Sequence, residues 1–413
     1  MGNMIGSGVF LLPAALAPFR GLSIAGWMVS AGGAVCLALV FAWLAAYKPA
    51  SGGPYAYTRL AYGDLAGFLV AWGYWISIWT ANAALAVAFV GYLDPFIPSI
   101  VRNPATAAGL AIALIWFMTA INCYGTGSAG RVQVVTTGLK ILPLLVIGIA
   151  GTFAFTPEHF SLQGVEGGIG RNLIATMTLT LWAFLGLESA TVPASQTADA
   201  ARTIPRATIV GTLLAALIYI VSTVGVMSVV DPVVLAKSTA PFADAARILA
   251  GEGAAALVAL GAAISCSGAL NGWVLLSGEV PRAVANDGLF PRVFARVSRR
   301  GTPMFAMIVG ATLSTAMVIM NSSGGLVEIF TFMILLSTLS TLVPYTFCSL
   351  AGVILHRQDG AMRWSTAAYV VSGIAFIYAM FSIGGAGADV VFSGFLLLMA
   401  GLPVFALMRN AEC

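Results

Sequence analysis

The stretch Asn3-Met4-Ile5-Gly6-Ser7-Gly8-Val9-Phe10 places two glycines and a serine inside an apolar segment. Hydrocarbon offers no water to peptide N–H and C=O groups, so a membrane helix is interrupted at depth only where the break faces protein or a cavity. A second stretch, Phe184-Leu185-Gly186-Leu187-Glu188-Ser189-Ala190, places a glycine and an acid in another apolar segment. Paired interruptions in the two halves of a chain are typical of transporters whose substrate site lies between the halves.

The composition is that of a membrane protein. Of 413 residues, 60% are hydrophobic and 8% are charged, whereas soluble domains carry about 25% charged residues. Continuous apolar runs long enough to cross about 30 Å of hydrocarbon favour helices over a barrel. These runs lie near residues 24–46, 65–92, 107–124, 134–155, 173–193, 208–230, 254–279, 303–320, 326–355, 364–383 and 389–408. Residues 4–18 add a shorter run, so we predict an all-α bundle of twelve helices in which a late start truncates the first helix.

The basic residues predict the orientation of this bundle. Counting the short first run as helix one, the connections after even-numbered helices hold thirteen of the nineteen Lys and Arg residues. Lys and Arg accumulate in cytoplasmic loops. The connections between helices 2 and 3, 4 and 5, 6 and 7, 8 and 9, and 10 and 11 are therefore expected in the cytoplasm.

Several classes of function lack their sequence signals. The five cysteines are scattered singly, without a CxxC or Cys/His cluster, and His159 and His356 fall in predicted loops. We therefore expect no metal site, no cofactor and no disulfide framework. An intramembrane enzyme would need a nucleophile–base pair within the helices, and a channel would need a filter or a ring of charges. Neither pattern is visible, so a transporter is favoured over an enzyme.

The chain is predicted to form one domain over residues 1–413. Residues 1–155 and 173–356 can be laid over each other as two repeats, each starting with an interrupted helix, and residues 363–409 are appended. Residues 241–249 have the pattern of an amphipathic helix on the outer surface.

Six short motifs resemble a known family. They are NMIGSGVFLLP at 3–13, PASGGPYAY at 49–57, LWAFLGLESA at 181–190, RTIPRA at 202–207, PFADAAR at 241–247 and ANDGLFP at 285–291. Together they resemble the amino acid–polyamine–organocation (APC) transporters, most closely the basic amino acid/polyamine antiporters of the arginine–agmatine type. The resemblance implies a five-plus-five inverted repeat with helices 1 and 6 broken, a bacterial inner-membrane location, homodimers and exchange by alternating access.

The first break offers peptide groups for a substrate. A half-helix that begins near Val9 directs its positive end toward a carboxylate. The resemblance implies that Met4, Ser7 and Gly8 contact the substrate. The alternative is that small residues here only permit close helix packing.

The second break carries an aromatic residue and an acid. Trp182 and Leu185 cover the substrate side chain in the family, and a Trp face attracts an ammonium or guanidinium group. Trp182 lies half-way through its apolar run, whereas interfacial anchors lie at the ends. Glu188 is the one acid well inside an apolar run, and charge at depth marks a pathway or proton site. The resemblance assigns it to a gate; the alternative is a protonated Glu that joins two helices.

Three stripes of polar and aromatic residues recur at i, i+4, i+8 spacing, which places each stripe on one helix face. Each stripe taken singly is more often a helix–helix contact, but three together fit one cavity. The resemblance implies substrate contacts for Asn82, Trp273 and Ser337, with Ser77 and Ile78 nearby, and gate positions for Tyr74 and Tyr345. The stripes are Tyr74, Ile78 and Asn82; Ser265, Ala269 and Trp273; and Ser337, Thr341 and Tyr345.

Two departures from the arginine exchanger concern the substrate and its coupling. Ile78 stands where that exchanger has a smaller residue, which narrows the pocket. Lys140 lies inside the apolar run 134–155, at a position where sodium-independent members of the superfamily carry a Lys. A buried Lys can carry a coupled proton or can bind backbone carbonyls freed by the first break.

We therefore predict a secondary antiporter that exchanges a cationic amino acid with its decarboxylated amine, of the arginine/agmatine or ornithine/putrescine type. Its partners are the small-molecule substrate, the lipid bilayer, a second copy of the chain and, through Lys140, protons; no nucleic acid is expected. The alternative is a proton-coupled symporter or exporter of neutral amino acids.

Overall fold

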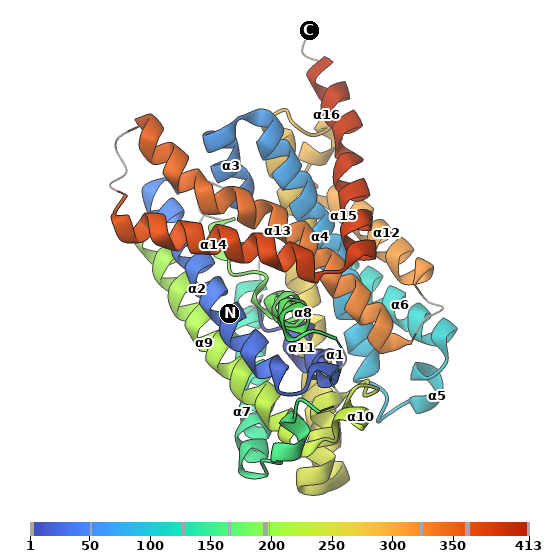
Figure 1. The fold of residues 1–413 in the computed structure, drawn as a ribbon. Helices are drawn as coiled ribbons and strands as arrows, with labels where there is room; N and C mark the ends of the chain where they lie inside the picture. Colours follow the sequence, from blue (N-terminus) through green and yellow to red (C-terminus); the bar gives the residue numbers. More distant parts are fainter. Residues whose placement is uncertain are drawn as a thin grey trace.

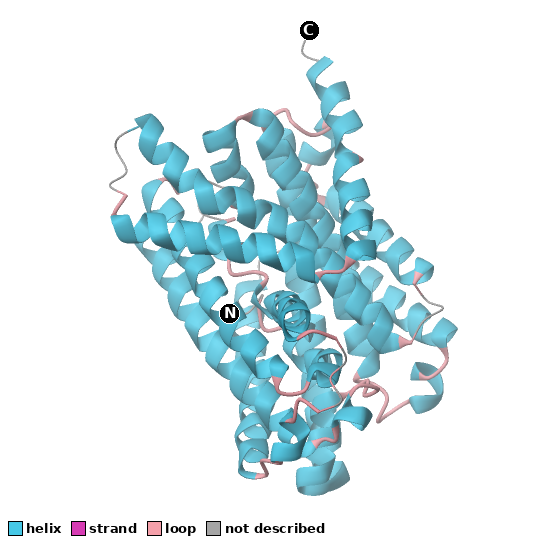
Figure 2. Ribbon diagram, viewed as in Figure 1, coloured by secondary structure: helices cyan, strands magenta, loops and turns pink. Residues whose placement is uncertain are grey.

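A computed structural model describes residues 4–49, 52–124, 129–163, 165, 167–192, 197, 199–321, 325–359 and 364–410. Within these ranges it leaves out the side chains of residues 7, 8, 129–137, 139, 359, 409 and 410. Every regular element in this part of the chain is helical (Figure 2). The predicted all-α class is therefore confirmed for the residues described.

Among the described residues, the first part of the chain contains seven α-helices. They are α1 (Ser7–Leu16), α2 (Leu22–Tyr47), α3 (Pro54–Tyr62), α4 (Asp64–Gly91), α5 (Pro98–Val101), α6 (Pro104–Tyr124) and α7 (Ala129–Phe153). Nine more follow: α8 (Ile169–Leu181), α9 (Ala200–Val229), α10 (Pro232–Leu235), α11 (Pro241–Asn286), α12 (Met304–Met320), α13 (Leu326–Asp359), α14 (Thr366–Gly385), α15 (Ala388–Met399) and α16 (Gly401–Asn410).

The long helices coincide with the apolar runs of the sequence. Among the described residues, nine helical stretches are long and apolar enough to cross a membrane. Three shorter apolar helices, at Val9–Phe19, Lys140–Phe153 and Met304–Met320, lie where further spans are predicted. A chain with this many apolar helices is a multi-pass membrane protein.

Helix α4 forms the centre of the bundle. Between Gly67 and Gly91 its residues are buried almost without exception, because α6, α11, α12 and α13 all pack against it. Such a helix is apolar on all sides and not along one stripe. The polar residues on α4 therefore face protein, which makes them candidates for a site.

The two ends of the bundle differ in their connections. We call the end that carries α3 and residues 287–303 the basic end, and the end that carries α5 and α10 the opposite end (Figure 1). Arg59 of α3 forms an ion pair with Asp287, which follows α11. This contact confirms that the 2–3 and 8–9 connections lie at the same end, as the basic residues predict.

Two details differ from the sequence prediction. Residues 241–249 form the start of α11, which turns at Gly251 with φ of 82°. Their helix is confirmed, but Phe242 and Ala246 are fully buried, so this face packs against protein and not on a membrane surface. The predicted last helix, 389–408, agrees with one apolar span at Ala388–Met408, but Ala400 separates it into α15 and α16. Beside this point a side chain on Gly401 would meet the Trp72 ring at 2.8 Å.

Candidate functional site

Helix α1 begins abruptly in the interior of the protein. Its N-cap, Gly6, has non-helical angles (φ −129°, ψ −144°), and none of the described side chains caps the first turn. A Cβ at Gly6 would lie 3.0 Å from Cβ of Ala269 and 3.2 Å from Cδ2 of Leu85. Glycine therefore allows the start of α1 to approach both α11 and α4. The uncapped first turn leaves peptide N–H groups for a ligand.

Three predicted contact residues belong to this region. Met4 is buried beside the start of α1. The backbones of Ser7 and Gly8 form the first residues of the helix, while their side chains lie outside the described part of the chain, as does Asn3.

Helix α8 ends inside the protein as well. Regular α-helix stops at Leu181, a single 3-10 turn covers Trp182–Phe184, and Leu185 is extended (φ −60°, ψ 137°). Gly186 then adopts φ of 96°, a left-handed conformation that only glycine enters freely. The chain between Trp182 and Glu188 is nevertheless buried. Its peptide groups therefore need protein or ligand partners.

Glu188 receives hydrogen bonds from three elements at this turn. The hydroxyl of Tyr74 on α4 donates to Oε1 at 2.7 Å, and the hydroxyl of Tyr345 on α13 donates to Oε2 at 2.5 Å. The backbone N–H of Gly186 also donates to Oε2, at 3.2 Å. Glu188 and both tyrosines have no exposed surface. One carboxyl group thus joins α4, α13 and the turn after α8.

No cation accompanies this carboxyl group. Among the residues that the structure describes, no Lys, Arg or His nitrogen lies within 4 Å of Glu188. Hydroxyl and N–H donors are the groups that hold it. We call Tyr74, Glu188 and Tyr345 the carboxyl cluster.

Two serines extend the carboxyl cluster toward the middle of α4. Ser77 Oγ donates to the Tyr74 carbonyl at 2.7 Å, and Ser337 Oγ donates to the Ser77 carbonyl at 2.8 Å. Ser337 and Tyr345 lie eight residues apart on α13, so the α4–α13 contact runs along one face of each helix. Asn82 lies about 12 Å farther along α4 than Tyr74, toward the opposite end.

The remaining predicted contact residues are buried outside this network. They are Ile78, Asn82, Trp182, Leu185 and Trp273, each at most 7% exposed. Two of them carry polar atoms without a hydrogen-bond partner in the described structure, namely Asn82 Oδ1 and Trp182 Nε1. Native proteins leave few buried polar atoms unpaired, and each such atom needs an explanation.

Lys140 is fully buried on α7. It lies within electrostatic range of Cys266 on α11, and α7 and α11 pack together. Ser265, next to Cys266, has a buried hydroxyl without a partner in the described structure. Lys140 on α7 therefore lies close to this part of α11.

A second polar cluster closes the basic end. Arg59 pairs with Asp64 through Nε at 2.7 Å and with Asp287 through Nη1 at 2.9 Å. The Tyr55 hydroxyl donates to the same Asp287 carboxylate at 2.7 Å. Burial and the hydrogen bond to Asp287 raise the pKa of Tyr55, so its phenol stays a donor. We call these four residues the rim cluster.

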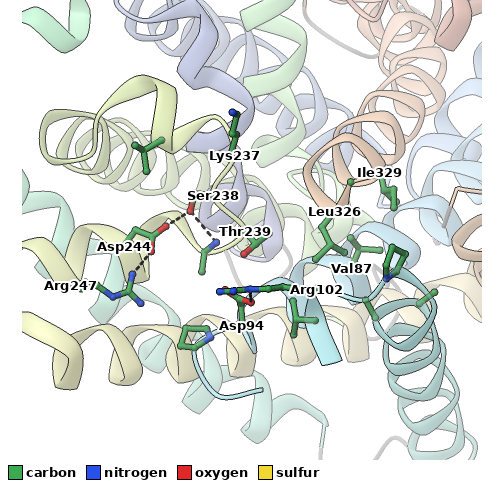
Figure 3. Close-up of a pocket in the computed structure, with 18 of the residues that line it drawn as sticks. Val87, Asp94, Arg102, Lys237, Ser238, Thr239, Asp244, Arg247, Leu326 and Ile329 are labelled. Carbon is green, nitrogen blue, oxygen red and sulfur yellow. Dashed lines mark hydrogen bonds and ion pairs between the residues drawn. The ribbon is translucent and has the colours of Figure 1, made fainter. Parts of the chain in front are cut away.

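The opposite end holds a cavity of about 810 Å³ (Figure 3). Its charged lining consists of Asp94, Arg102, Lys237, Asp244 and Arg247. Arg102 pairs with Asp94 at 3.1 Å, Arg247 pairs with Asp244, and Ser238 donates to Asp244 at 2.5 Å. Not one of the predicted substrate contacts lines this cavity. It is therefore a separate feature from the residues around the two interrupted segments.

The structure places some residues beside the site that no sequence pattern indicated. Tyr92, at the end of α4, donates a hydrogen bond to the Phe10 carbonyl of α1 at 2.5 Å. Phe41 on α2 packs its ring edge-on against Tyr345 at 5.6 Å. A tyrosine at the end of an apolar run is usually an interfacial aromatic residue, and contacts between distant helices leave no local pattern.

The fold and the site define a class of protein. A multi-pass helical membrane protein with two interior helix ends and a buried carboxyl group between them has the features of a transporter. The chain matches the amino acid permease family over residues 1–384. It therefore belongs to the amino acid permease family, a part of the APC superfamily.

Two relatives illustrate the relationship. A cadaverine/lysine antiporter of Escherichia coli (strain K12) is 32% identical over 98% of this chain and 92% of its own length. The putrescine transporter PotE of the same strain is 30% identical over 99% of this chain and 93% of its own length. These matches confirm the predicted family and the location of the chain as a multi-pass protein of the bacterial inner membrane.

Proposed function

We propose that this protein is a secondary antiporter that exchanges a cationic amino acid for its decarboxylated amine by alternating access. The relatives named above act on lysine, cadaverine and putrescine by name, and the identity extends over nearly the whole chain. The proposal includes the finer fold: twelve helices in a five-plus-five inverted repeat, formed by residues 1–155 and 173–356, with helices 1 and 6 broken. It also includes a homodimer.

The observation that carries the proposal is the pair of unpartnered polar atoms near the interrupted segments. Asn82 Oδ1 is an acceptor and Trp182 Nε1 is a donor, and both are buried. Leaving such an atom unsatisfied costs about 1–3 kcal/mol. An ammonium group on the substrate supplies a donor for Asn82, and a carboxylate supplies an acceptor for Trp182. A cationic amino acid carries both groups.

The start of α1 supports the same substrate class. Its uncapped first turn attracts an α-carboxylate through N–H groups and the helix dipole. We assign the substrate to the space bordered by Met4, Ser7, Gly8, Ser77, Ile78, Asn82, Trp182, Leu185, Trp273 and Ser337. Trp182 and Trp273 present ring faces that attract the distal cation.

The carboxyl cluster and the rim cluster then act as two barriers on one side. Both lie between the α4 residue Asn82 and the basic end, which positive-inside bias assigns to the cytoplasm. In this arrangement the cytoplasmic path is closed. Opening it requires that Glu188 exchange its tyrosine donors for other partners, which links the gate to the turn after Trp182.

Lys140 supports a second candidate function. A buried amine on α7 can release and take up a proton during transport, and Ile78 narrows the pocket. Proton-coupled symport or export of a neutral amino acid is the alternative that these two residues favour. In the antiporter, Lys140 acts instead as a fixed cation that replaces sodium.

Proteoliposomes distinguish the two. Vesicles are loaded with lysine, ornithine, arginine, cadaverine or putrescine, or left empty, and uptake of labelled lysine or ornithine is measured. Antiport predicts uptake that requires an internal counter-substrate. Symport predicts uptake of labelled neutral amino acids into empty vesicles under an inward proton gradient. Uptake that neither condition raises above protein-free vesicles refutes both.

A matched pair of variants ties the activity to the site. Trp364 also has a buried, unpartnered indole N–H in the described structure. It lies just before α14 and packs against Trp43 of α2, outside the proposed site. Trp182→Leu is expected to abolish exchange, whereas Trp364→Leu keeps it. Equal activity of the two variants would remove Trp182 from the proposed site.

A further inference from the structure

The first helix is held by a tyrosine from another part of the bundle. Tyr92 directly follows α4 and has no exposed surface. Its hydroxyl donates to the Phe10 carbonyl in α1 at 2.5 Å. The two rings meet edge to face, with centroids 5.9 Å apart. A side-chain hydrogen bond and a ring contact therefore act on the same residue of α1.

The helix that receives this bond is weak by its own sequence. The helix is ten residues long and contains Pro13. Proline has no N–H, and its ring crowds the carbonyl four residues earlier, so this turn of α1 is weakened. Helices this short have little stability of their own. Tertiary contacts such as the one from Tyr92 must therefore determine where α1 lies.

A third aromatic residue completes the contact. Phe242, in the first turn of α11, packs edge-on against Phe10 with centroids 5.3 Å apart. Its backbone amide is a second polar neighbour of the Tyr92 hydroxyl. The end of α4 and the start of α11 pack closely here, because a Cβ at Gly91 would lie 2.7 Å from the Thr239 carbonyl oxygen. Phe10 is thus held between the end of α4 and the start of α11.

This contact lies two residues from the proposed substrate contacts in α1. Gly8 and Phe10 both belong to the first turn of α1, so a shift of the Phe10 backbone also moves the peptide groups of that turn. The N–H groups of that turn are the ones proposed to hold a carboxylate. The position of Phe10 therefore determines the orientation of those N–H groups toward the carboxylate.

We propose that Tyr92 is a positioning residue for recognition of the substrate carboxylate, and that it acts through Phe10. The assignment rests on the proposed function and deepens it. It predicts a loss of affinity for lysine but not for cadaverine, whereas a role in stability alone predicts no such difference. Lysine has an α-carboxylate and cadaverine has none, so a misplaced α1 weakens the binding of lysine and leaves that of cadaverine unchanged.

The test is the affinity of detergent-purified Tyr92→Phe protein for lysine and for cadaverine, measured by calorimetry. The control is Tyr57→Phe on α3, because Tyr57 is also fully buried and its hydroxyl has no partner in the described structure. One hydrogen bond is worth about a five-fold to ten-fold change in affinity. We expect Tyr92→Phe to raise the Kd for lysine by about that factor and the Kd for cadaverine by less than about two-fold.

The outcomes separate the two proposals. If wild-type protein binds neither lysine nor cadaverine, the proposed function fails and the assignment falls with it. If wild-type protein binds both, and Tyr92→Phe changes neither Kd or changes both equally, the positioning role is refuted while the function stands. Melting temperatures of both variants identify an effect on folding. Should Tyr92→Phe not purify, Phe242→Leu removes the second ring of the contact and must give the same selective loss for lysine.

Discussion

The carboxyl cluster and the rim cluster use the same chemical groups in opposite surroundings. In each, one carboxyl group joins helices from different parts of the chain, and tyrosine hydroxyls donate to it. Glu188 is fully buried and has no cation within 4 Å among the described residues. Asp287 is 43% exposed and pairs with Arg59, which is 33% exposed.

The difference in exposure to water determines how much free energy the contacts of each cluster contribute. Water competes for the rim cluster, so its ion pairs contribute about 0–1 kcal/mol each and weaken in salt. No water competes for Glu188, and removing it leaves its donors unpaired in the interior. In the proposed gate, the buried carboxyl cluster therefore stabilises the closed arrangement strongly. It opens only when the protein offers the Glu188 carboxyl group other partners.

The largest effect is expected for Glu188→Ala. Three buried donors lose their acceptor, namely the Tyr74 and Tyr345 hydroxyls and the Gly186 N–H, at about 1–3 kcal/mol each. Exchange in proteoliposomes should fall about 100-fold or more. Glu188→Gln keeps an acceptor and serves as the matched control with a smaller loss. Exchange by Glu188→Ala at the wild-type rate would show that this cluster is no gate.

A variant of Lys140 tests whether this buried residue has a role different from that of Glu188. Lys140→Ala should abolish any uptake driven by a pH gradient if this amine carries the proton. Initial rates are measured with and without the gradient, and Lys237→Ala, at the exposed opposite end, is the control. A pH dependence that survives Lys140→Ala excludes the coupling role and favours a fixed cation.

An intermediate effect is expected when one donor is removed. Tyr345→Phe removes one hydrogen bond to Glu188, and a double-mutant cycle with Glu188→Ala should give a coupling energy of about 1–3 kcal/mol. Tyr62→Phe is the control, because the hydroxyl of Tyr62 on α3 donates at 3.2 Å to the Phe347 carbonyl of α13, the helix that carries Tyr345. A coupling energy near zero would show that the buried hydrogen bond from Tyr345 contributes no more than the exposed ion pairs of the rim cluster.

The smallest effect is expected for Asp287→Asn. The variant weakens an ion pair and keeps an acceptor for Tyr55, so exchange should change by less than about five-fold and approach the wild-type rate at high salt. The raised pKa of Tyr55 keeps its phenol protonated, so this difference should stay constant between about pH 6 and 9. A large loss that salt does not reduce would mean that the rim cluster is as important as the carboxyl cluster.

Much of the helix pattern could be predicted from the sequence. The predicted runs 65–92 and 303–320 match α4 and α12 within one residue at each end. Hydrocarbon requires a continuous apolar segment, and that requirement is local. The separation of α15 from α16 at Ala400 was not predicted. It lies beside the close approach of Trp72 to Gly401, a contact between residues far apart in the sequence.

The candidate site shows the same division. Glu188 and Trp182 stand out in the sequence because an acid and a central Trp are unusual in an apolar run. That Tyr74 and Tyr345 are the donors to Glu188, and that Ser337 binds the Ser77 carbonyl, depends on how α4 packs against α13. Tyr92 gave no signal, since it resembles an ordinary aromatic residue near the end of a helix, and the family motif that contains Phe242 did not indicate its contact with Phe10.

The sequence by itself determined the membrane-spanning helices, the family motifs and the two segments where helix formation fails, because each depends on neighbouring residues and the surrounding hydrocarbon. Only the tertiary structure decided which donors meet Glu188, which buried atoms are left for a ligand, and what holds α1 in place. Hydrogen bonds and ring contacts require distances of a few ångströms between residues that are tens to hundreds of positions apart. Those distances are set by helix packing, which no local pattern records.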